Sequence, residues 1–125
     1  MISGDLLARV QARPERFGLD GSYRSMATFL IGFDLGNSGG ILRGFNEWLV
    51  VKLGHATSLG WSSLVLQMEF PCGEVRTADG LSSSQERRAV DRLFSLLSEF
   101  ATVRESPMAL AEIYSRYLAL QELGE

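Results

Sequence analysis

The chain has 125 residues, a length that suits one domain built around one hydrophobic core. Hydrophobic residues make up 46% of it and charged residues 22%, a composition that excludes an intrinsically disordered chain. The net charge of −3 comes without a basic block, so we expect no binding to nucleic acid. The apolar runs are far shorter than the roughly 20 residues of a membrane span, and the N-terminus lacks a secretory pattern. We therefore expect a cytoplasmic protein that does not enter a membrane.

Two helices are predicted in the first third of the chain. The first runs from Ser3 to Ala12, and Pro14 ends it. The second begins after Ser22, a residue type favoured at the N-cap of a helix. Apolar residues at spacings of three and four continue this helix to Leu35, and Gly36 suits the left-handed position just past a helix end.

The third predicted helix covers residues 41–53, and Gly54 closes it. Gly44 lies inside this pattern, where it weakens a helix by ~1 kcal/mol relative to Ala. We interpret Gly44 as the mark of another backbone that approaches closely. Arg43 and Glu47 are four residues apart, a spacing that favours an ion pair on the outer side of the helix.

The segment 61–70, "WSSLVLQMEF", fits both a helix and a strand by its periodicity. We favour a helix because helices are predicted on both sides of it, and Pro71 ends the segment in either case. A loop follows, with a turn at Asp79 and Gly80. A short hairpin in the 66–82 region stays open as an alternative.

Two further helices are predicted at the C-terminal end. Ser83 and Glu86 have the spacing of a capping box, and an apolar stripe of period 3.6 follows to about Val103. Ser106 and Pro107 then start the last helix. Its buried stripe is predicted to consist of Leu110, Ile113, Tyr114, Tyr117 and Leu118. The sequence thus predicts an all-α fold, a compact single-domain bundle of five or six helices over residues 1–125.

The single cysteine, Cys72, and the single histidine, His55, exclude an internal disulfide and a His/Cys metal cluster. We expect Cys72 to be an unreactive thiol, and we expect no metal and no cofactor. Residues 31–40, "IGFDLGNSGG", locally resemble the first phosphate loop of the actin, sugar-kinase and heat-shock chaperone superfamily. This resemblance would imply that Asp34 binds a magnesium ion through a water molecule. A helical pattern precedes the motif here, and the chain is too short for two lobes, so we predict a helix end and a turn, and no catalytic residue.

Residues 40–60, "GILRGFNEWLVVKLGHATSLG", together with Trp61, resemble small helical immunity proteins encoded beside bacterial polymorphic toxins. Immunity proteins bind and block a cognate toxin, so the resemblance implies a non-enzymatic inhibitor. It also implies docking through the loops that flank the third helix. On this basis we predict six partner-binding residues: Asp34, Asn37, Arg43, Glu47, His55 and Trp61.

From Glu105 to its end the chain holds four acidic residues and one basic residue, which favours a basic partner. We therefore expect a protein partner, a basic toxin domain encoded nearby. The alternative is a small enzyme or ligand-binding domain with a pocket around Asp34, Glu47 and His55, since carboxylates and imidazole perform acid–base catalysis. The sequence leaves open whether the protein is a monomer or a homodimer.

Overall fold

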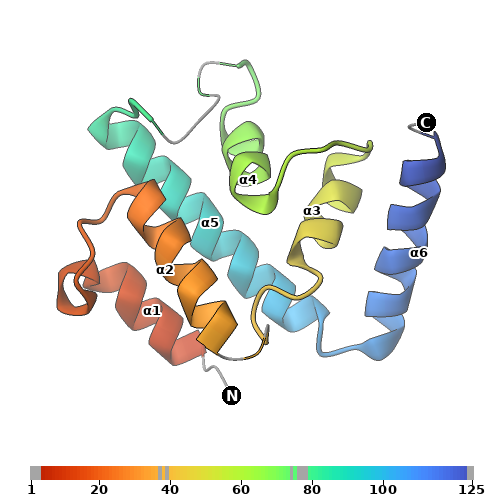
Figure 1. The fold of residues 1–125 in the computed structure, drawn as a ribbon, viewed down its shortest axis with the longest axis horizontal. Coiled ribbons are helices and arrows are strands. Elements are labelled where there is room, and N and C mark those ends of the chain that lie inside the picture. The colour runs from red at the N-terminus through yellow and green to blue at the C-terminus, as the bar shows by residue number, and fades with distance from the viewer. Residues whose placement is uncertain (1–3, 37, 39, 74, 76–78, 124–125) are drawn as a thin grey trace.

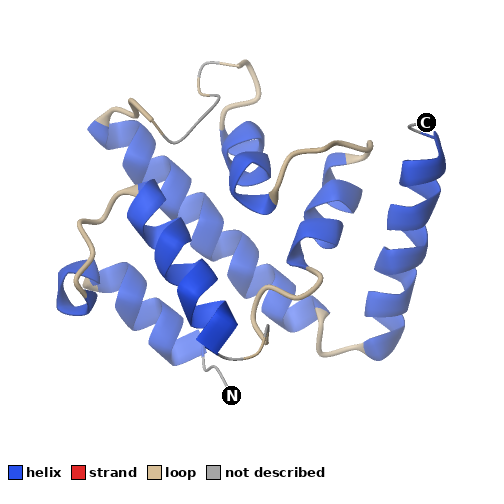
Figure 2. Cartoon of the chain, viewed as in Figure 1, coloured by secondary structure: helices blue, strands red, loops and turns tan. Residues whose placement is uncertain are grey.

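The computed structural model describes residues 4–36, 38, 40–73, 75 and 79–123 (Figure 1). Throughout these residues the regular secondary structure is helical (Figure 2). The elements are α1 (Gly4–Ala12), η1 (Pro14–Phe17, a 3₁₀ helix), α2 (Tyr23–Gly36), α3 (Phe45–Leu53), α4 (Trp61–Glu69), α5 (Ser83–Val103) and α6 (Pro107–Leu123). The predicted all-α bundle is confirmed, and so is the helical choice for 61–70. The described residues of the 66–82 region contain no strand, while residues 74 and 76–78 lie outside the description.

Helix α5 forms the centre of the bundle, and α1, α2, α3 and α4 all pack against it (Figure 1). Its inward face follows the predicted 3.6-residue period and is fully buried at Leu93 and Phe100. The rings of Phe45 and Trp48 from α3 meet Phe100 at centroid distances of 5.5 and 5.4 Å. None of the helices in the described part of the chain is long and apolar enough to cross a membrane.

Helix α2 begins as predicted, because the Ser22 hydroxyl accepts a hydrogen bond of 3.1 Å from the Ser25 N–H. Its end differs from the prediction by a residue. Gly36 is the last residue of the helix, whereas we expected it in a left-handed conformation beyond the end.

The capping box of α5 lies one residue earlier than predicted. Ser82 accepts a hydrogen bond from the Gln85 N–H at 3.2 Å, and the Gln85 side chain accepts one from the Ser82 N–H at 2.9 Å. Glu86 is therefore free for a distant contact, and its carboxylate accepts a hydrogen bond of 2.7 Å from the Tyr23 N–H. The prediction of a box from Ser83 and Glu86 was wrong, since Ser82 and Gln85 form the box.

Helix α3 begins at Phe45, four residues later than predicted. Gly44 has a φ of 85°, in the left-handed region that interrupts a right-handed helix. A Cβ at Gly44 would lie 3.3 Å from the Cζ atom of Phe100, so Gly44 does mark a close approach. The approaching group is an aromatic side chain, however, and not the backbone that we predicted.

Helix α6 differs most from its prediction, because none of its side chains is buried. Leu110, Ile113 and Tyr117 pack against the core and are partly buried, as the predicted stripe requires. Tyr114 and Leu118 do not belong to that inward face and are 57% and 50% exposed. The reason is that α6 packs chiefly against α3 at one side of the molecule, so only a narrow face of it is covered (Figure 1).

Candidate functional site

A cleft of about 720 Å³ lies between α6 and the turn that leads into α3. We call it the α3–α6 cleft. Three parts of the chain line it: the segment from Ser38 to Glu47, Arg104 at the end of α5, and the first turns of α6. The lining residues are Ser38, Gly40, Arg43, Gly44, Glu47, Arg104, Leu110, Ala111, Ile113 and Tyr114.

Asp34 fixes the turn that forms one wall of this cleft. Its Oδ1 atom accepts hydrogen bonds from the N–H groups of Ile41 and Leu42, at 2.9 and 2.8 Å. A carboxylate that accepts hydrogen bonds from backbone N–H groups stabilises a turn in the way an N-cap residue stabilises the start of a helix. The chain enters this turn from helix α2 and not from a strand, so the predicted helix end and turn are confirmed.

Arg43 and Glu47 both line the cleft, but they do not form the predicted ion pair with each other. The left-handed Gly44 separates them and removes the helical geometry on which the four-residue spacing depends. Arg43 instead donates to the Ser38 carbonyl oxygen at 3.4 Å. Glu47 is half-buried and makes no ion pair with any residue that the structure describes. The cleft therefore holds an acidic and a basic group that both remain available to a ligand.

Arg104 ties the end of α5 to the same turn. Its Nη1 atom donates to the Ile41 carbonyl oxygen at 2.9 Å. A guanidinium has five N–H donors, so most of them remain available. In the described chain no carboxylate pairs with Arg104. Together with Arg43 it gives the cleft two positive groups against the single carboxylate of Glu47.

The outer surface of α6 continues the apolar wall of the cleft. Ala111, Tyr114 and Leu118 have the spacing of one helix face, and we call them the α6 outer stripe. Ala111 and Tyr114 also line the cleft, so stripe and cleft form one continuous surface. The Tyr114 ring stacks on the inward-facing Tyr117, with centroids 6.2 Å apart and planes inclined at 20°. This contact fixes the orientation of an exposed aromatic ring.

The remaining predicted site residues lie elsewhere. Exposed His55 follows the C-terminal end of α3, with its Nδ1 atom 3.2 Å from the Ala56 carbonyl oxygen. It lies beyond the left-handed Gly54, whereas Glu47 lies in the first turn of α3 at the other end of that helix. Trp61 starts α4 and packs on Phe45 at 5.9 Å. Asn37 lies outside the described residues. The structure thus gathers Arg43 and Glu47 over the turn held by Asp34, and places His55 and Trp61 away from them.

Several residues of this surface were missing from the predicted site, among them Arg104, Tyr114 and Leu118. Arg104 reaches a turn 63 positions away, a pairing that no local pattern reveals. Tyr114 and Leu118 were both assigned to the buried stripe of the last helix, but they are exposed. A signal was present, since the predicted α6 stripe spans more of the helix circumference than one neighbouring helix can cover.

The described residues contain no group of three His, Cys, Asp or Glu side chains that could hold a metal ion. Cys72, which we expected to be an unreactive thiol, is exposed after α4. Comparison of the chain with protein-family models, curated proteins and solved structures finds no match to any of them.

Proposed function

We propose that this is a non-enzymatic binding protein, and that a protein partner docks on the α3–α6 cleft and the α6 outer stripe. The observation that carries the proposal is that α6 has no buried side chain and exposes a continuous apolar face. A helix kept only for the stability of a small domain would turn such residues inward. Apolar surface that is exposed and rimmed by polar groups is characteristic of interaction sites.

The composition of this surface suits a protein partner. Tyrosine is enriched among the residues that dominate binding energy, because its ring buries a large area at a small cost in side-chain entropy. Tyr114 is such a residue, held by its stacking on Tyr117. Arg43, Glu47 and Arg104 add charged groups at the edge of the apolar surface. Such groups fix the orientation of a partner and speed its association.

The charges around the stripe favour a basic partner. Four acidic residues and one basic residue follow from Glu105 onward, and the one Arg in α6, Arg116, is paired with Glu112 at 3.0 Å. The exposed carboxylates of this last part of the chain attract positive groups of a partner, while Arg43 and Arg104 in the cleft suit its negative groups. Combined with the resemblance of residues 40–61 to immunity proteins, this supports a toxin-neutralising role. We propose that the partner is a basic toxin domain encoded nearby, whose active site the protein covers.

The test is co-expression with the product of the adjacent gene, followed by co-purification and a growth assay. We expect a complex and protection of the cells. Leu118→Glu and Tyr114→Ala should each abolish both, since they remove the apolar contacts. Ile31→Glu is the matched control, because Ile31 is 47% exposed on α2, away from α6, and should leave binding intact.

Three outcomes would overturn the proposal. The first is that the neighbouring product neither binds nor is neutralised. The second is that Leu118→Glu and Ile31→Glu behave alike, because the surface would then lie elsewhere. The third is a homodimer that Leu118→Glu dissociates, since the stripe would then serve a second copy of the chain.

A further inference from the structure

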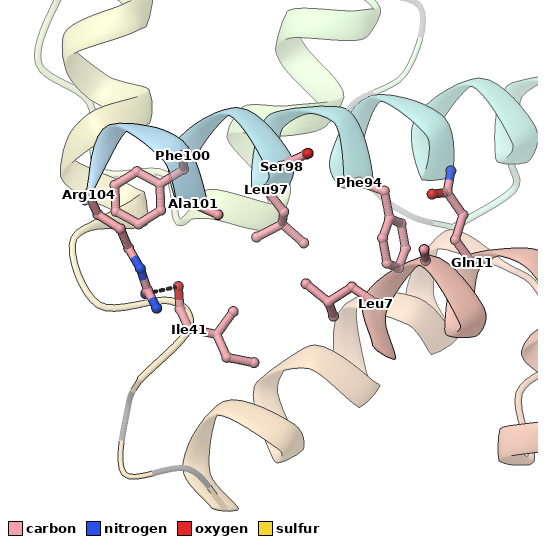
Figure 3. Close-up of a pocket in the computed structure, with 10 residues that line it drawn as sticks. Leu7, Gln11, Ile41, Phe94, Leu97, Ser98, Phe100, Ala101 and Arg104 are labelled. Carbon is pink, nitrogen blue, oxygen red and sulfur yellow. Dashed lines mark hydrogen bonds between the residues drawn. The ribbon is translucent and has the colours of Figure 1, made fainter. Parts of the chain in front are cut away.

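A second cavity, of about 170 Å³, lies between α1, α5 and the turn that leads into α3 (Figure 3). Leu7, Ile41 and Leu97 project toward it from these three elements (Figure 3). Phe94 and Phe100 complete an apolar wall. It is distinct from the α3–α6 cleft and shares only Arg104 with it.

The apolar wall of this cavity is built from the folded core. Ile41, Phe94, Leu97 and Phe100 are all buried, so their positions are set by packing and do not depend on a ligand. A Leu/Ile/Phe-lined cavity of about 150 Å³ is large enough to bind benzene. The cavity therefore has room for one aromatic ring or a branched aliphatic group of similar size.

One end of this apolar cavity carries a positive charge. Arg104 lies there, beside Ile41, and its bond to the Ile41 carbonyl oxygen holds the guanidinium in place (Figure 3). No Asp or Glu is among the residues that line the cavity, and none pairs with Arg104 in the described chain. Gln11 also lines the cavity, and its side-chain amide donates a hydrogen bond of 3.2 Å to the Asp91 carboxylate. The arginine is thus the one charged group on the lining and has donors to spare.

We propose that this cavity binds a small organic carboxylate with one aromatic ring or a branched aliphatic group. The apolar part lies among Leu7, Phe94 and Leu97, and the carboxylate accepts hydrogen bonds from the Arg104 guanidinium. The fork of N–H groups in arginine matches the two oxygens of a carboxylate, and such charge-assisted bonds are about twice as strong as neutral ones. The binding adds a small-molecule site to the protein, and this site shares only Arg104 with the surface proposed above for a protein partner.

The test is a titration of the full chain with benzoate, followed by two-dimensional ¹H–¹⁵N NMR. Saturable shifts should centre on Leu7, Ile41 and Leu97, with a Kd on the order of 1 mM for a ligand of this size. Benzamide and benzyl alcohol have the same ring without the charge. They should bind about tenfold more weakly or worse, as loss of a charge-assisted hydrogen bond predicts.

Two variants that introduce the same side chain, leucine, at neighbouring positions separate the cavity from the rest of the surface. Ala101→Leu places a larger side chain on the cavity lining and should weaken benzoate binding about tenfold or more. Thr102→Leu changes the neighbouring exposed residue of α5, which does not line the cavity, and should leave the Kd unchanged. Arg104→Met should remove the preference for benzoate over benzamide. If Arg104→Met fails to fold, the ligand series and the Ala101→Leu result still decide the question.

The proposal is overturned by any of three results: benzoate causes no saturable shifts, benzamide binds as tightly as benzoate, or Ala101→Leu and Thr102→Leu give the same Kd.

Discussion

The carboxylate of Glu86, in the first turn of α5, accepts a hydrogen bond of 2.7 Å from the backbone N–H of Tyr23, the first residue of α2. The N–H groups in the first turn of a helix have no partner within that helix, so an acceptor there is stabilising. The negative charge also lies at the positive end of the α2 dipole. One side chain thereby connects the starts of two helices that are 63 positions apart in sequence.

Glu86→Ala should lower the free energy of unfolding by about 1–2 kcal/mol, because it leaves a part-buried N–H without an acceptor. Urea denaturation followed by circular dichroism measures this. Arg87→Ala, at the next and exposed position, should stay within about 0.5 kcal/mol of the wild type. Equal stability of the two variants would show that the Glu86 bond contributes nothing.

Gly44→Ala should destabilise the protein by about 1–3 kcal/mol. The backbone at Gly44 has a φ of 85°, and an added Cβ would press on Phe100 at 3.3 Å. Gly36→Ala is the control, because this glycine is helical and a Cβ there meets nothing within 4 Å. That change should be neutral or stabilising by up to about 1 kcal/mol. The reverse order of the two midpoints in urea would contradict the left-handed assignment at Gly44.

The local signals in the sequence were sufficient for helix identity but not for register. Ser82, Ser83 and Ser84 are consecutive, and both Gln85 and Glu86 suit the third position of a capping box. Local rules cannot choose between the two registers. The choice depends on the contact between Glu86 and Tyr23, which exists only once α2 and α5 have packed. The periodic stripe of residues 41–53 likewise conceals the left-handed residue that divides it.

The candidate site was predictable only in part, for the same reason. Arg43 and Glu47, two of the residues named from the sequence, both line the cleft, Arg43 just before α3 and Glu47 in its first turn. Arg104 and Tyr114 complete the surface from α5 and α6. Their position follows from how α6 packs on α3, and the apolar pattern of α6 alone does not reveal which of its faces is left uncovered.

Asp34→Ala should loosen the turn that forms one wall of the cleft. The two backbone N–H groups that donate hydrogen bonds to this carboxylate would lose their acceptor. The free energy of unfolding should fall by about 1–3 kcal/mol. Hydrogen exchange at Ile41 and Leu42 should accelerate more than exchange in α4. Glu105→Ala, which removes an exposed carboxylate between α5 and α6, is the control and should change neither quantity. Unchanged exchange at Ile41 would show that Asp34 does not hold the turn.

Stability at alkaline pH should depend on Tyr23. Burial raises the pKa of its phenol above the ordinary value of 10.0, and its hydroxyl donates to the Ser62 carbonyl oxygen at 2.6 Å. A raised pKa means that the folded state binds the phenolic proton more tightly than the unfolded state. The stabilisation is therefore complete below pH 10 and is lost as the pH rises toward the folded pKa, by up to about 1.4 kcal/mol per pH unit.

Tyr23→Phe should remove this part of the alkaline slope while costing about 1 kcal/mol at neutral pH, through the lost hydrogen bond. Urea midpoints measured from pH 8 upward give both numbers. Tyr114→Phe is the matched control, since that ring is more than half exposed and the loss of its hydroxyl should change the free energy of unfolding at neutral pH by less than about 0.5 kcal/mol. If stability falls with rising pH equally steeply in the wild type and in Tyr23→Phe, the Tyr23 phenol does not cause the alkaline loss of stability.

The α6 outer stripe should contribute little to folding. Leu118 is 50% exposed, whereas Leu93 is fully buried at the centre of α5. Leu93→Ala should cost about 2–5 kcal/mol because it removes a methyl-rich side chain from a packed core. Leu118→Ala should cost less than about 1 kcal/mol, as expected for an exposed helical position. If both variants lost several kcal/mol, Leu118 would be a structural residue and the stripe would not be a docking surface. If Leu118→Ala lowers the free energy of unfolding only slightly while Leu118→Glu loses partner binding, Leu118 contributes to binding and not to folding.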